Sequence, residues 1–186
     1  MRWAKRAVVA LLPVIAFLLF WTTQAAWGRS VVDGTRYKFD LTGVARISSP
    51  DSPGEVRDHC SWYESPATLR HCATAASGAE AYRLLELAPA AAALSILSFA
   101  AIVLIAARDL VVSRRRILAL VSVCGALTMF VAIQLLTRNI GRAIAIYAGQ
   151  ALEMRGSGLT TAWLAAVFFA VSAAITVAPN SLSTQP

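Results

Sequence analysis

The sequence predicts an all-α membrane protein. We expect a four-transmembrane-helix bundle with a small, disulfide-braced, β-containing loop outside the membrane. Of the 186 residues, 58% are hydrophobic and only 15% are charged, whereas soluble domains have about 25% charged residues. Four apolar stretches are each close to the roughly 20 residues that a helix needs to cross a bilayer. Composition therefore excludes a cytosolic enzyme, a disordered tail and a disulfide-rich toxin.

We place the spans at residues 7–27, 87–107, 117–137 and 159–178 of a single domain, 1–186. Backbone polar groups inside a bilayer must be satisfied within the segment, so stretches of this length form helices and not strands.

The first span also has features of a cleaved signal peptide. A basic start precedes it, and Thr23-Gln24-Ala25 is similar to a cleavage site. Its apolar run of about 15 residues is at the long limit for a signal peptide. Trp21 and Trp27 are placed as in an interfacial aromatic belt, so we expect the span to be retained.

The polar segment 28–86 separates the first two spans and contains seven basic and eight acidic residues. Residues 30–32 and 35–41 flank an Asp-Gly pair, the pattern of a β-hairpin. A third strand is expected at 43–47. The segment is therefore predicted to hold a small antiparallel sheet.

Two helices are expected to extend beyond their spans. The pattern becomes helical at 73–85 and runs on into the second span, with Pro89 as a kink. Apolar residues also recur at helical spacing over 138–154. Either the third helix projects beyond the bilayer, or a separate amphipathic helix lies on its surface.

Basic residues before the first span and in the connection 108–116 set the expected orientation. The positive-inside rule places both segments, and both termini, in the cytoplasm. The long loop is then extracytoplasmic, and the expected location is the plasma membrane or a bacterial inner membrane. The net charge of +7 is interpreted as this topology signal, so no nucleic-acid partner is predicted.

Cys60 and Cys72 lie twelve residues apart in the long loop, where an oxidising compartment favours disulfides. We predict a disulfide between them, worth roughly 3 kcal/mol; the alternative is a redox-active pair, although reactive dithiols are usually closer in sequence. His59 and His71 precede these cysteines, but spacing defines no third ligand, so no metal or other cofactor is predicted. Cys124, within the third span, is interpreted as a packing residue.

Two sets of residues are predicted to make contacts. Aromatic side chains are favoured at binding surfaces, and those of the outer loop are Tyr37, Phe39, Trp62 and Tyr63. Small residues let helices approach closely, either within the bundle or from a partner protein. The fourth span carries such a stripe at Ala162, Ala166, Ala170 and Ala174.

The cores of the four spans contain no ionisable residue, although such residues usually mark ion, proton or substrate pathways. No Gly-rich phosphate loop, zinc motif or nucleophile elbow is present either. We therefore predict that the chain is not an enzyme.

The four spans, the long first outer loop with strands and two cysteines, and the short basic inner loop resemble the claudin and peripheral-myelin-protein-22 superfamily. Trp27, Cys60, Cys72 and Arg83 match the family's Trp after the first span, its cysteine pair and its Arg near the second span. The family's Gly-Leu-Trp is missing, and Trp62 follows Cys60 instead of preceding it. The resemblance implies a non-enzymatic protein that uses its disulfide-braced outer sheet for contacts between proteins or cells, or that accompanies a larger membrane complex.

The leading hypothesis is thus a structural or accessory subunit, or a contact protein. Its expected partners are the lipid bilayer, other membrane proteins or a larger membrane complex, and a second copy of the chain. One alternative is a membrane thiol-disulfide oxidoreductase using Cys60 and Cys72. The other is a small oligomeric channel or transporter.

Overall fold

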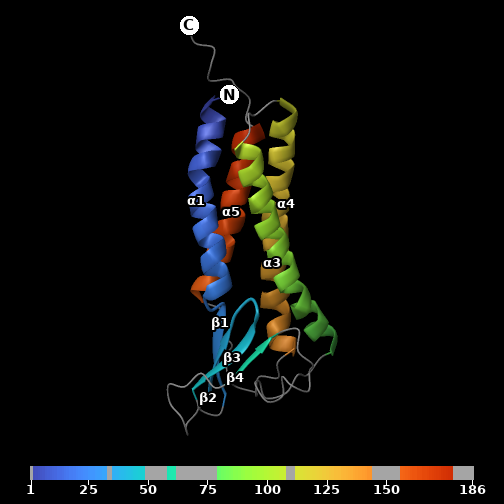
Figure 1. Cartoon of the computed structure of the whole chain (residues 1–186). Coiled ribbons are helices and arrows are strands. Elements are labelled where there is room, and N and C mark those ends of the chain that lie inside the picture. The colour runs from blue at the N-terminus through green and yellow to red at the C-terminus, as the bar shows by residue number, and fades with distance from the viewer. Residues whose placement is uncertain are drawn as a thin grey trace.

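The computed structural model describes residues 2–32, 35–48, 58–61, 79–107, 112–143 and 156–177. In that part of the chain, long helices stand side by side and an antiparallel sheet lies at one end of the bundle (Figure 1). The helices are α1 (Arg2–Gln24), α3 (Ala79–Ala106), α4 (Val112–Ala143) and α5 (Ser157–Val177). All four are long and apolar enough to cross a membrane, which supports the predicted four-helix membrane bundle.

The apolar windows of these helices cover Arg6–Gln24, Leu84–Ala106, Arg115–Asn139 and Ser157–Val177. α1 ends at Gln24, before the end of the predicted first span, because the chain turns toward the sheet over residues 25–27. α3 begins at Ala79 and continues through Pro89. α4 has 32 residues, about 48 Å at roughly 1.5 Å per residue, so it exceeds a hydrocarbon core of about 30 Å.

The helices expose large apolar side chains and bury many small ones. Phe17 on α1, Leu104 on α3 and Leu120 on α4 are among the most exposed side chains, whereas Ala92 and Ala165 are almost completely buried. Lipid is as apolar as the helix surface, so close packing of small residues drives helix association in a bilayer. The exposed leucines and phenylalanines therefore suit contact with lipid.

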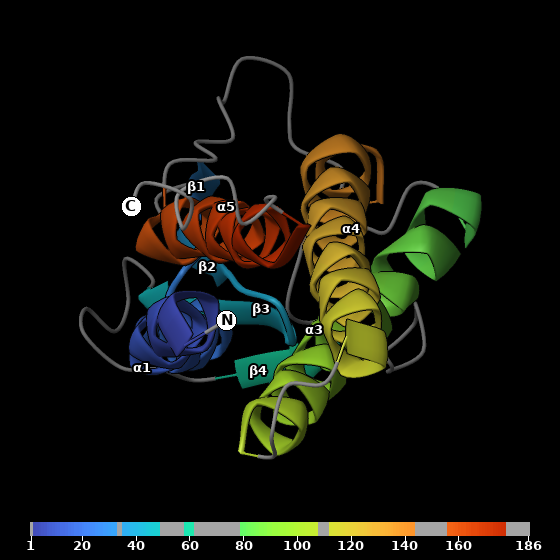
Figure 2. The ribbon, with the colours of Figure 1, turned by 90° about the horizontal axis from the view of Figure 1, so that it is seen from above.

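The helices pack in the order α1, α5, α4, α3, so α5 lies between α1 and α4 (Figure 2). Gly125 brings α4 close to α5: a Cβ at this position would lie 2.7 Å from a ring atom of the buried Phe169. α1 meets α3 much less extensively than it meets α5.

Each of the three close helix pairs is joined by a pair of hydroxyl groups. In a bilayer such bonds hold helices together because water does not compete for them. The pairs are Thr22 with Thr161 at 3.1 Å, Ser95 with Thr128 at 2.7 Å and Ser122 with Ser172 at 3.4 Å.

Double replacement of Ser95 and Thr128 tests whether these bonds stabilise the bundle. A double-mutant cycle with Ser95→Ala and Thr128→Val should give a coupling free energy of about 0.6 kcal/mol, the average for helix–helix hydrogen bonds in membranes. Thermal unfolding in a mild detergent measures it. The same cycle with Ser95→Ala and Thr137→Val should give no coupling, because the Thr137 hydroxyl donates to the carbonyl oxygen of Ile133 in its own helix; equal couplings would contradict the role of the bond.

The sheet is a four-stranded antiparallel meander in the order β1-β2-β3-β4. Its strands are β1 (Gly28–Val32), β2 (Thr35–Phe39), β3 (Gly43–Ser48) and β4 (Asp58–Ser61). The predicted hairpin and third strand are confirmed. β4 was not predicted, because Asp58-His59-Cys60-Ser61 lacks the alternation of apolar and polar residues typical of a strand; pairing with β3 makes it one.

Candidate functional site

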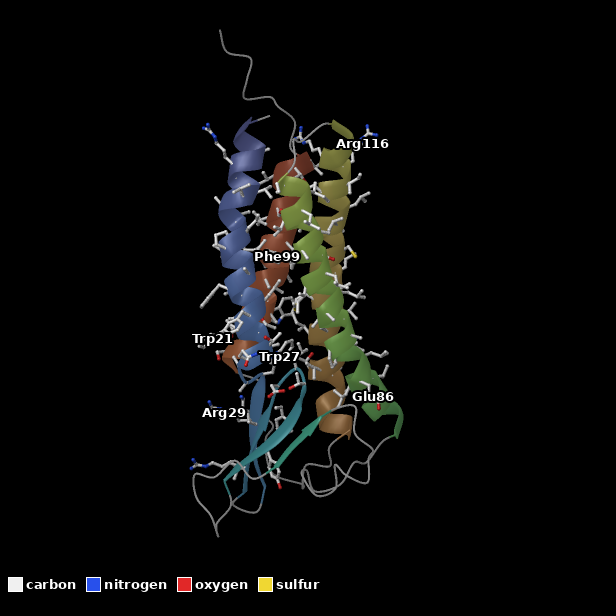
Figure 3. All side chains as sticks on the ribbon, in the orientation of Figure 1. Trp21, Trp27, Arg29, Glu86, Phe99 and Arg116 are labelled. Atoms are coloured by element: carbon white, nitrogen blue, oxygen red, sulfur yellow. The ribbon has the colours of Figure 1, made fainter. Side chains whose placement is uncertain are left out.

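Trp27 connects the bundle to the sheet. Its side chain is completely buried (0% exposed), and Figure 3 shows it between the helices and the strands. The indole Nε1 donates a hydrogen bond to the carbonyl oxygen of Thr22 in α1 at 3.0 Å. The backbone N–H of Trp27 donates to the carbonyl oxygen of Phe39 in β2 at 2.8 Å. One residue thus ties α1 to the second strand.

The start of α5 bonds to the same short segment. The N–H of Gly156 donates to the carbonyl oxygen of Trp27 at 3.0 Å, and that of Gly158 donates to Ala26 at 2.9 Å. These are N–H groups at a helix start, which have no partner within the helix. We call residues 25–27 and 156–158 together the junction; it binds α1, α5 and the sheet to one another.

Both glycines of the junction are required by the close approach of the two segments. A Cβ at Gly158 would lie 2.5 Å from the carbonyl oxygen of Ala25 and 2.6 Å from Cδ1 of Trp27. A Cβ at Gly156 would collide with the carbonyl group of Ala26. The obstacles at Gly156 are backbone atoms, which cannot rotate away as a flexible side chain can.

Hydrogen bonds to Asp40 hold the turn between β2 and β3. The buried carboxylate of Asp40 accepts hydrogen bonds through Oδ1 from the Thr42 N–H (2.8 Å), the Thr42 hydroxyl (2.7 Å) and the Gly43 N–H (3.0 Å). This is the local bonding by which Asp stabilises tight turns. Leu41, in the same turn, is buried in the cluster that also contains Trp27, so the turn packs into the core of the molecule.

The structure buries two of the four aromatic residues predicted as contact residues. Tyr37 and Phe39 belong to the core cluster that joins the sheet to the bundle. Trp62 and Tyr63 lie outside the described residues. Successive residues of a strand point to opposite faces, so burial of Tyr37 and Phe39 places Lys38 on the other face of β2.

The other face of the β1–β2 hairpin is basic and exposed. Arg29, Val31 and Arg36 are exposed and Lys38 is half-buried. Arg29 stands directly opposite Lys38 in the antiparallel register, and Val31 opposite Arg36. The predicted contact residues were aromatic and did not include this face. The alternation of basic and aromatic residues in Arg36-Tyr37-Lys38-Phe39 does indicate a strand with one basic face.

The cysteine and histidine predictions fall partly outside the described residues. The backbone of Cys60 lies in β4 opposite Val44, and that of His59 lies opposite Ala45. Cys72 and His71 are outside the described residues, so the disulfide stays a prediction. Cys124 carries a free thiol on the exposed surface of α4.

The alanine stripe of α5 divides between two environments. Ala162 and Ala166 are buried against the bundle, whereas Ala170 and Ala174 are exposed. A spacing of four residues advances about 40° around a helix of 3.6 residues per turn, so the stripe winds out of the interface. The buried line continues instead through Phe169.

At the end of the bundle opposite the sheet, a cavity of about 510 Å³ is lined by the basic residues Arg115 and Arg116, by Thr176, and by the apolar residues Ala119, Leu120 and Val177. The Nε of Arg115 donates to the carbonyl oxygen of Thr176 in the last turn of α5. A cation at this position is favourable because the C-terminus of a helix carries partial negative charge. α5 has no basic residue of its own in this turn.

Comparison of the chain with models of known families and with curated proteins gives no match. The class of protein is therefore defined by the part of the chain that the structure describes: four helices long and apolar enough to cross a membrane, and an antiparallel sheet joined to one end of them.

Proposed function

We propose that the chain is a non-enzymatic structural or accessory membrane protein that presents its sheet to other membrane proteins. The observation that supports this most is the junction, where Trp27 bonds to α1 and to β2, and Gly156 and Gly158 bond the start of α5 to Trp27 and Ala26. A contact surface that is already ordered loses less conformational entropy on binding. Such a constrained sheet therefore suits a docking platform.

The interior of the bundle supports a packing role. Buried hydroxyl groups of the spans bond to neighbouring helices or to carbonyl oxygens of their own helix, as Ser98 does to Leu94 and Thr176 to Ala173. Satisfied hydroxyl groups of this kind stabilise a helix bundle. They support a scaffold better than they support a transport pathway.

The proposed orientation places the sheet outside the cell membrane and both termini in the cytoplasm. Arg116 lies at the end of the bundle opposite the sheet (Figure 3), and short basic connections favour the cytoplasmic side. The arrangement is also compatible with the claudin-like layout, in which a bond between Cys60 and Cys72 would brace the outer loop.

Extraction of the tagged protein in a mild detergent, followed by mass spectrometry at native size, tests this function. We expect a stoichiometric set of larger membrane proteins. Val31→Glu, on the exposed face of β1, should reduce their recovery, whereas Leu104→Ala on the exposed surface of α3 should not. Recovery of the wild-type protein only as a partner-free monomer would contradict the proposal.

A further inference from the structure

A cavity of about 610 Å³ lies where the bundle meets the sheet. Trp21 from the last turn of α1, Arg29 of β1, Lys38 of β2 and Ser157 at the start of α5 line it, together with Ala25, Ala26 and Gly156. These residues come from four different elements. The cavity is therefore a product of the tertiary structure and not of one loop.

The charge of this cavity is strongly positive. Arg29 and Lys38 are directly opposite each other in the antiparallel pair, and like charges in that position destabilise a sheet. Neither side chain has an acidic partner among the residues that the structure describes. A bound anion between the two cations would replace this repulsion with attraction.

The position of the cavity matches the level of lipid headgroups. The helical span of α1 ends at Gln24, and Arg29 follows in the first strand. Trp21 is 42% exposed and stacks on Phe17, with ring centroids 6.0 Å apart. Tryptophan favours the membrane–water interface. Figure 3 shows Trp21 and Arg29 on the same side of the molecule, Arg29 nearer the sheet.

We propose that this cavity binds the phosphate group of an anionic phospholipid in the leaflet next to the sheet. The guanidinium group of Arg29 suits bidentate bonding to phosphate oxygens, and Lys38 adds a second charge on the same face. Ser157 supplies a hydroxyl donor at a helix start, where anions are favoured. The acyl chains lie along the exposed rings of Trp21 and Phe17.

Lipid binding by the delipidated full chain in mild detergent tests the proposal. The probes are phosphatidylglycerol, phosphatidylcholine and inorganic phosphate, each titrated and followed by native mass spectrometry. Arg29→Gln and Lys38→Gln should each weaken phosphatidylglycerol binding about tenfold, the effect of losing one charged hydrogen bond. Arg36→Gln is the matched control, because it removes the same charge from the same face of β2 outside the cavity.

A second measurement separates loss of the site from loss of the fold. Without lipid, Arg29→Gln and Lys38→Gln should unfold at the wild-type temperature or slightly above it, because each removes the repulsion. Equal phosphatidylglycerol binding by wild type and both variants would overturn the proposal, as would equal binding of phosphatidylcholine. Displacement of phosphatidylglycerol by inorganic phosphate at comparable concentration would assign the site to a free anion and overturn the lipid assignment.

Discussion

Replacing Gly156 with alanine should destabilise the protein by about 3 kcal/mol, the upper part of the range for overpacking a closely packed site. The added Cβ would collide with the carbonyl group of Ala26. Relief requires α5 to move away from residues 25–27, which would also break the bonds that Gly156 and Gly158 donate. Thermal unfolding in a mild detergent, followed by circular dichroism, measures the loss.

Thr160→Ala is the control for this change, because Thr160 lies in the first turn of the same helix and is exposed. It should leave the unfolding temperature nearly unchanged, as most exposed substitutions do. An alanine at Gly156 that unfolds at the wild-type temperature would contradict the close approach of α5 to the segment after α1.

Replacing Trp27 with alanine should lower the free energy of unfolding by about 3–5 kcal/mol, as for other buried large aromatic residues. The change leaves a cavity between the bundle and the sheet and removes the bond from Nε1 to Thr22. The sheet should separate from the helices before the helices themselves unfold. Limited proteolysis should therefore cut between residues 28 and 48 in this variant much faster than in the wild type.

Two further variants separate the contributions of Trp27. Trp27→Phe keeps most of the buried ring but loses the indole donor, so it should lower the free energy of unfolding less than Trp27→Ala does. Trp163→Ala removes a 42% exposed Trp that packs edge-on against Phe130 with centroids 5.7 Å apart; about 1 kcal/mol is expected. If Trp27→Ala and Trp163→Ala lower the free energy of unfolding equally, the burial of Trp27 adds no stability beyond that of an exposed Trp.

The helices were predictable because a bilayer makes a strong demand that a sequence shows directly, an apolar run of about 20 residues. The hairpin was predictable because β1 and β2 surround an Asp-Gly pair. β4 was not predictable, because its own residues carry no strand pattern. It becomes a strand through pairing with β3, a separate segment of the chain.

The junction could not be predicted from local patterns. The sequence around Gly156 and Gly158 indicates only a turn, and nothing near them indicates that they face Trp27. The contact surface predicted for the outer loop differs from the structure for a related reason. Aromatic residues suit both a contact surface and a core, and only the position of the bundle decides that Tyr37 and Phe39 face inward.

The packing of α1 against α5 also constrains how the protein is made. Thr22 and Thr161, which bond to each other, are 139 residues apart in the chain. At a synthesis rate of about 5–20 residues per second, roughly 7–28 s separate their appearance at the ribosome. The first helix therefore enters the membrane without its main neighbour. α3 and α4, adjacent in sequence, are able to pair meanwhile, and the arrival of α5 joins the two parts.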